Sequence, residues 1–101
     1  MPAYFIAEID VTDPDAYEPY KPLAAASIAA HGGTFRVRGG ATEAVEGPPV
    51  AGRVVVVEFA DVEAARRWYH SDDYQEALPL RQAASTGRAF LVEGCDGGAP
   101  A

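Results

Sequence analysis

The fold of this chain is decided by the stretch Arg53-Val54-Val55-Val56-Val57-Glu58-Phe59, the strongest strand signal in the sequence. Four consecutive β-branched residues favour an extended backbone, because branched side chains pack well on a pleated surface. An apolar run without polar interruption is typical of a strand that is covered on both faces. We therefore expect a sheet that is shielded on each side.

Three other segments predict strands around it. Residues 3–11 alternate between apolar and polar side chains, residues 34–38 form a second strand, and residues 87–93 form the last one. Gly39-Gly40 ends the second strand, and residues 41–49 are expected to form a short edge hairpin or loop.

Helices are predicted in the two remaining parts of the chain. Thr12-Asp13-Pro14 combines a capping residue with proline at the first helical position, so a short helix over 15–20 and a longer one over 21–30 should follow. Gly32 supplies the stop. Further on, Asp61 caps a helix to about His70, and Ser71 caps another to about Ser85 that Pro79 should kink.

The order of elements is β-α-β-β-α-β, the ferredoxin-like α+β pattern with an antiparallel sheet. Such a sheet carries both helical layers on one face. We expect one domain over residues 1–94 and a flexible tail over residues 95–101, which is rich in glycine.

Sorting the strand residues by alternation separates two faces of the sheet. The face under the helices should carry Phe5, Ala7, Ile9, Phe35, Val37, Val55, Val57 and Phe59. The opposite face should carry Tyr4, Ile6, Glu8, Arg36, Arg38, Val54, Val56 and Glu58. Apolar side chains on that second face would form a patch typical of an association site, so a homodimer with two sheets packed face to face, a dimeric α+β barrel, is predicted.

Composition excludes several classes of protein. The chain has 101 residues and a formal net charge of −7, which disfavours binding to nucleic acid and to anionic membranes. One cysteine, Cys95, rules out an internal disulfide or a cysteine-based metal site. Without a recognisable signal segment or membrane span, we expect a cytoplasmic location.

Several short motifs together resemble a known family. They are His31-Gly32-Gly33, Arg38-Gly39-Gly40, Val55-Val56-Val57-Glu58-Phe59, Trp68-Tyr69-His70-Ser71, Tyr74-Gln75 and Arg81. In this combination the chain resembles the bacterial domain of unknown function 1330 family of the dimeric α+β barrel superfamily, from Tyr4 to Gly94. The resemblance implies the same fold and a dimer. The wider superfamily includes cofactor-free monooxygenases and lactone isomerases, which gives a further hypothesis by analogy alone.

Two residues are candidates for proton transfer. His31 ends a helix, where it either contacts the last carbonyls or acts as a general base at a pocket. Glu58 should face Arg38 across neighbouring strands. That pair either fixes the dimer or leaves Arg38 to bind a substrate carboxylate while Glu58 orients it or acts as base.

A second set of candidates could bind a ligand. These residues straddle two predicted helices: Trp68, Tyr69, Ser71, Tyr74 and Arg81. They serve either as core packing around a helix cap or as the wall of a ligand pocket with Arg81 at its rim.

No glycine-rich phosphate loop precedes a helix, the two histidines are far apart in sequence, and no serine has a nucleophile-elbow context. We therefore predict no cofactor and no metal. Two hypotheses remain: a homodimeric enzyme or binder of a small anionic or aromatic metabolite between sheet and helices, and a non-catalytic dimeric module. The sequence does not decide whether the protein is an enzyme.

Overall fold

The computed structural model of the protein describes residues 1–95. Its elements are β1 (Ala3–Val11), α1 (Pro14–Tyr17), α2 (Tyr20–Ala30), β2 (Thr34–Arg38), β3 (Arg53–Phe59), α3 (Val62–Tyr69), α4 (Asp72–Ala84) and β4 (Ser85–Glu93). The tail expected over residues 95–101 lies outside the described residues except for Cys95, so its flexibility stays a prediction.

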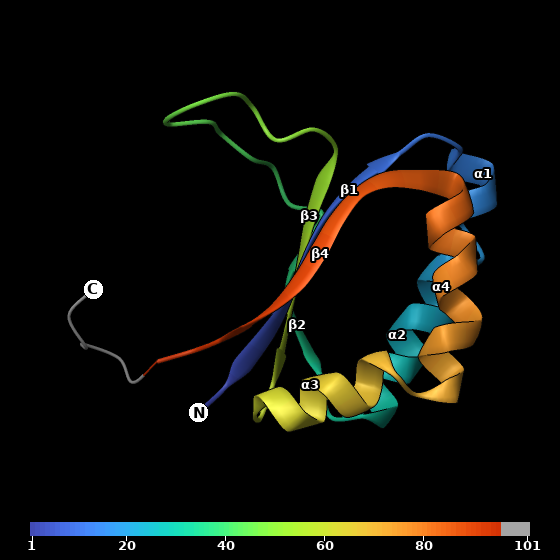
Figure 1. The fold of residues 1–101 in the computed structure, drawn as a ribbon. Helices are drawn as coiled ribbons and strands as arrows, with labels where there is room; N and C mark the ends of the chain where they lie inside the picture. The colour runs from blue at the N-terminus through green and yellow to red at the C-terminus, as the bar shows by residue number, and fades with distance from the viewer. Residues whose placement is uncertain (96–101) are drawn as a thin grey trace.

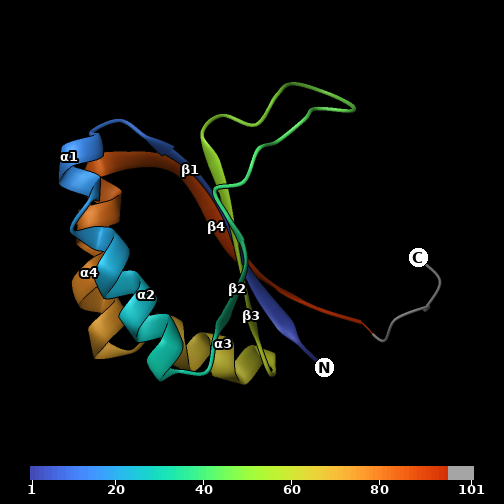
Figure 2. The same ribbon diagram turned by 180° about the vertical axis from the view of Figure 1, so that it is seen from behind.

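The four strands form one antiparallel sheet in the order β2-β3-β1-β4. All four helices lie on one side of this sheet, and the long loop between β2 and β3 projects toward the other side (Figures 1 and 2). The ferredoxin-like α+β prediction is therefore confirmed. The side of the sheet under the helices is called the helix side below, and the other is called the open side.

Local capping explains where α1, α3 and α4 begin. The side chains of Asp13, Asp61 and Ser71 accept hydrogen bonds from Ala16 N (3.2 Å), Ala64 N (2.8 Å) and Tyr74 N (3.3 Å). The sequence predicts Asp61 and Ser71 as caps, and for the first helix it leaves Asp13 or Thr12, of which Asp13 is the cap. α4 continues through Pro79 to Ala84 and leads directly into β4, two residues earlier than predicted.

The core lies between the helix side and the helices, and Trp68 of α3 is at its centre. Trp68 is fully buried, with its ring centroid 4.9 Å from that of Phe5 and 5.3 Å from that of Phe59. Its Nε1 donates a hydrogen bond to Ser27 Oγ of α2 at 3.0 Å. This contact ties α3 to α2, so the indole joins the helical layer to the sheet.

A bulge in β2 changes which face its last residues occupy. Phe35 pairs with Val57, but the next pairs are Val37 with Val56 and Arg38 with Val55, so Arg36 is the extra residue. Val37 therefore lies on the open side and Arg38 on the helix side. The sequence prediction was wrong for both residues because alternation assumes a regular strand.

The predicted pair between Arg38 and Glu58 is wrong for the same reason. Glu58 lies on the open side, where its Oε1 accepts a hydrogen bond from Arg36 Nε at 3.2 Å. A second ion pair on this side joins Arg88 Nη2 to Glu8 Oε2 at 3.0 Å.

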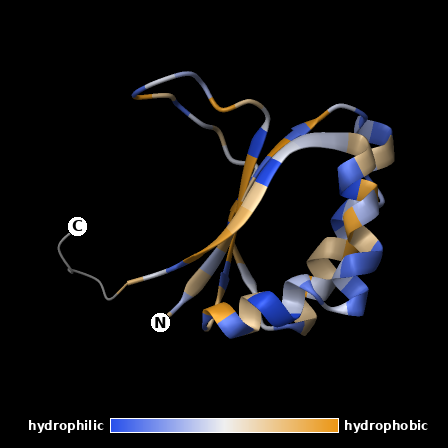
Figure 3. Ribbon diagram, in the orientation of Figure 1, coloured by the Kyte–Doolittle hydropathy of each residue, from blue (hydrophilic) through white to orange (hydrophobic). Residues whose placement is uncertain are grey.

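Between these ion pairs the open side carries an apolar band. The band consists of Tyr4, Ile6, Val54, Val56, Phe90 and Val92, which the strand register places on one face. The sheet is coloured hydrophobic along much of its length in Figure 3. Phe90 and Val92 are each 41% exposed in the single chain. Within residues 1–95, no helix has the length and apolar character that spanning a membrane requires.

Candidate functional site

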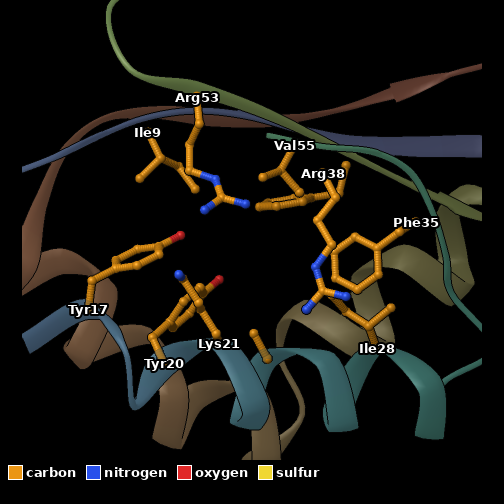
Figure 4. Close-up of a pocket in the computed structure, with 11 residues that line it drawn as sticks. Ile9, Tyr17, Tyr20, Lys21, Ile28, Phe35, Arg38, Arg53 and Val55 are labelled. Carbon is orange, nitrogen blue, oxygen red and sulfur yellow. The ribbon is translucent and has the colours of Figure 1, made fainter. Parts of the chain in front are cut away.

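The candidate site is a cavity of about 210 Å³ between the helix side of the sheet and helices α1 and α2 (Figure 4). It is lined by Phe5, Ile9, Tyr17, Tyr20, Lys21, Ala24, Ile28, Phe35, Arg38, Arg53 and Val55. Most of these side chains are aliphatic or aromatic, so the cavity offers an apolar body with a few polar groups. This combination is typical of small-molecule sites.

The polar groups in the lining are unbalanced in charge. Lys21, Arg38 and Arg53 are three of the eight basic residues in the chain, whereas no acidic residue within positions 1–95 lines the cavity. Lys21 Nζ is 2.9 Å from Glu18 Oε1, which lies outside the lining. The cavity is thus locally basic in a protein of net charge −7.

Arg53 is placed by the pairing of β3 with β1. It stands opposite Ile9, whose side chain is buried on the helix side, so Arg53 points to the same side. Its Nε is buried and has no hydrogen-bond partner among the described residues. A buried donor without a partner is costly, and an incoming acceptor would remove that cost.

Gly39 leaves room for the guanidinium of Arg53. The backbone of Gly39 has φ +73°, and a Cβ at this position would lie 2.8 Å from Arg53 Nη2. At the other end of the same loop, Gly52 has φ +80°, and a Cβ there would lie 2.2 Å from the carbonyl oxygen of Ile9. The two glycines therefore let the loop ends close tightly around the first residue of β3.

Arg38 reaches the cavity because of the bulge in β2. Its Cζ lies 4.3 Å from the centroid of the Phe35 ring, within cation–π distance. The ring and the guanidinium together form one end of the cavity (Figure 4).

Two tyrosines complete the polar lining. The Tyr20 hydroxyl is 2.9 Å from the Tyr74 hydroxyl, and burial together with Tyr74 raises the pKa of Tyr20. Burial also raises the pKa of Tyr17, against the opposing effect of Arg53, Arg81 and Lys21. Both phenols are therefore neutral near pH 7, so they do not offset the positive charge of the lining.

The two candidates for proton transfer lie apart from the cavity and from each other. His31 follows α2, where its Nδ1 is 2.9 Å from the Ser27 carbonyl oxygen and 3.9 Å from Asp73 Oδ2. Glu58 lies on the open side with Arg36. Neither residue is part of the cavity lining.

Of the predicted ligand-binding residues, Arg38 lines the cavity and the other five lie elsewhere. Trp68 and Tyr74 are fully buried in the core, and the Ser71 hydroxyl donates to the Trp68 carbonyl at 2.6 Å. Tyr69 and Arg81 line a second, more open cavity of about 360 Å³ beside the start of β4. The structure therefore does not bring the predicted set together in one pocket.

Sequence reasoning missed Lys21, Arg53, Tyr17 and Tyr20. A signal existed for Arg53, since it shares the alternation of Val55 and Val57 and so belongs to the face predicted under the helices. The tyrosines and Lys21 lie around two prolines, Pro19 and Pro22, where helical periodicity is a weak guide.

Taken together, the lining can hold a small anion with an apolar body: guanidinium groups suit carboxylates, and aromatic rings suit a flat hydrocarbon. A family model described as a domain of unknown function (DUF1330) matches residues 2–95, nearly the whole chain. The chain belongs to this family. The resemblance predicted from the motifs is confirmed, and the family description assigns no activity to the DUF1330 chain.

Solved structures share the fold of this DUF1330 protein. A protein of unknown function from Rhodopseudomonas palustris is 20% identical, with a TM-score of 0.75 over 94% of this chain and 83% of that one. SnoaB, a cofactor-independent oxygenase from Streptomyces nogalater, is 20% identical, with a TM-score of 0.63 over 94% of each chain. HapK from Hahella chejuensis is 16% identical, with a TM-score of 0.65 over 98% of each chain. At these identities the likeness concerns the fold. No curated protein matches the chain.

Proposed function

We propose that this DUF1330 protein binds a small organic anion with an aromatic or other flat apolar body, in the cavity between the sheet and helices α1 and α2. The observation that carries the proposal is the lining itself: the part of the chain that the structure describes contributes three basic side chains and no acidic one to it, although the sequence has fifteen acidic residues. A requirement for solubility alone would not place basic side chains around a cavity in an acidic protein.

The buried Arg53 Nε supports an anion in particular. A neutral ligand would leave this charged group only weakly solvated, whereas a carboxylate would accept charge-assisted hydrogen bonds from it. The size of the cavity supports a ring. An apolar protein cavity of roughly 150 Å³ is enough to take up benzene, and this one measures about 210 Å³.

The proposal includes a homodimer that forms through the apolar band and acts in the cytoplasm. Burial of Ile6, Val56 and Phe90 against a second copy would remove an apolar face from water and enclose two ion pairs that orient the sheets. The single exposed thiol of Cys95 suits a reducing compartment.

The rival hypothesis of a purely structural module expects the polar residues to serve assembly alone. Arg36, Glu58, Glu8 and Arg88 fit that role, since they are paired on the open side. Arg38 and Arg53 do not, because both point to the helix side and line the cavity. The cavity thus favours binding of a ligand.

The test is a thermal-shift titration of the purified protein with benzoate and with toluene. Benzoate at about a hundred times its dissociation constant should stabilise the fold by roughly 2.7 kcal/mol, which raises Tm by about 10 °C or more in a domain of this size. Toluene should give a smaller shift. Arg53→Met should remove most of the benzoate effect, while Arg67→Met, at an exposed position of α3, should leave it unchanged. Equal shifts with both compounds would contradict the role assigned to the basic lining.

A further inference from the structure

The basic side chains of the cavity lie beside two different aromatic rings. Lys21 Nζ and Arg53 Cζ lie 5.8 and 6.0 Å from the centroid of the Tyr17 ring, and Arg38 Cζ lies 4.3 Å from the centroid of the Phe35 ring. Figure 4 shows Tyr17 and Phe35 at opposite sides of the cavity, with one arginine near each. We call these the Tyr17 end and the Phe35 end.

The arginine at each end lacks an acidic partner among residues 1–95. Within residues 1–95, the arginines in ion pairs are Arg36, Arg66 and Arg88, and all three pairs lie outside the cavity. Arg38 and Arg53 are within 4.0 Å of no carboxylate in this part of the chain. Each guanidinium therefore keeps its donors for a ligand, and the two positive charges repel across the cavity until they are neutralised.

Between the two ends the wall is apolar. Phe5, Ala24 and Val55 line it, and the Tyr20 hydroxyl, which also belongs to the lining, is engaged by the Tyr74 hydroxyl at 2.9 Å. A complementary molecule would have a hydrocarbon middle and an anionic group at each end. A molecule with one anionic group would neutralise one end and leave the other arginine uncompensated.

We propose that the ligand of this cavity is a small dicarboxylate with a flat or short apolar spacer, one carboxylate at Arg53 and the other at Arg38. The inference rests on the proposed function of the same cavity and narrows its substrate class. Carboxylates suit both ends because a planar guanidinium donates two parallel hydrogen bonds to a carboxylate. Lys21, whose Nζ is paired with Glu18, also lies at the Tyr17 end.

The experiment compares ligand pairs that differ by one charge and keep the same ring. Terephthalate and isophthalate are titrated against the wild-type protein by calorimetry, each beside its own monomethyl ester. In at least one pair the dianion should bind about 10-fold more tightly or better, the value expected for one added charge-assisted hydrogen-bond pair. In Arg38→Met the dianion and its monoester should bind with nearly equal affinity, whereas Arg53→Met should weaken both and Arg67→Met neither.

The outcomes separate this inference from the proposed function. If the monoesters bind as tightly as their dianions in the wild-type protein, the inference of a dicarboxylate is overturned and anion binding stands. If neither dianions nor monoesters bind, both proposals are overturned. The comparison within the wild-type protein needs no variant to fold. Should Arg38→Met lose its structure by circular dichroism, Arg38→Lys takes its place, with a reduced preference for the dianion as the expected result.

Discussion

Replacement of Ser27 by alanine should destabilise the protein because it removes the hydrogen-bond acceptor of the buried Trp68 indole. Ser27 Oγ accepts a hydrogen bond from Trp68 Nε1 at 3.0 Å and donates one to the Ala24 carbonyl at 2.8 Å. Ser27 is 1% exposed and Trp68 is fully buried. In Ser27→Ala the indole N–H would lose its acceptor where water has no access.

The magnitude follows from that loss. A buried donor left without a partner costs about 1–3 kcal/mol, so Ser27→Ala should lower the free energy of unfolding by this amount. In a domain of this size, 1 kcal/mol corresponds to a shift in Tm of roughly 4–8 °C. Thr42→Ala, at an exposed position of the β2–β3 loop, should change the free energy by less than about 0.5 kcal/mol and serves as the control.

A double-mutant cycle tests the cause. Trp68→Phe removes the donor itself, so Ser27→Ala should cost less in that background than in the wild-type protein, with a coupling of about 1 kcal/mol or more. The assay is unfolding in urea, which gives the free energy of unfolding of each single variant and of the double variant. These free energies are compared where the dependence on urea concentration has the same slope. Strictly additive free energies would show that the hydrogen bond between α2 and α3 contributes nothing specific, and would refute the reasoning.

Three further predictions concern the loop, the sheet and the buried phenols. Gly52→Ala should strongly lower the urea concentration at the midpoint of unfolding, because Gly52 has φ +80° and a Cβ there would clash with the Ile9 carbonyl oxygen. Gly40→Ala serves as the control and should be nearly neutral, since a Cβ there would meet nothing within 4 Å. Similar midpoints for the two variants would contradict the requirement for glycine at position 52. Ile6→Asp should convert the proposed dimer into a monomer in analytical ultracentrifugation; a dimer that persists would place the interface elsewhere. Burial and Tyr74 raise the pKa of Tyr20 above the value of about 10 in the unfolded chain, so the folded state keeps the phenol proton to higher pH. The contribution of Tyr20 to stability should therefore be fully present below pH 10 and decrease as the pH rises beyond it. Thermal melting across this pH range should show a shallower decrease in Tyr20→Phe.

Most of the fold is predictable because its signals are local. The helix caps at Asp13, Asp61 and Ser71 are side-chain contacts over three residues, and the valine run of β3 is a continuous pattern. The order of these elements then leaves the ferredoxin-like arrangement as the natural solution, with helices on one face.

The site is less predictable because it depends on register. Whether Arg36 or Arg38 faces the helices is decided by how β2 pairs with β3, which no local pattern specifies. The cavity also combines residues of β1, α1, α2, β2 and β3, whose proximity arises only in the folded chain. The aromatic cluster of α3 and α4 drew attention by composition, and most of it packs the core instead.

The bulge at Arg36 also has a consequence for comparing this chain with its relatives. It makes the pairing register of β2 with β3, rather than the identity of the residues, the property that decides which arginine enters the cavity. A chain with the same Arg-Val-Arg sequence but regular pairing at this point would turn its second arginine to the open side and its valine to the helix side, with no change in composition. Aligned letters would then be identical while the chemistry of the two pockets differed. Relatives of this protein are thus best grouped by the register of this strand before they are grouped by sequence.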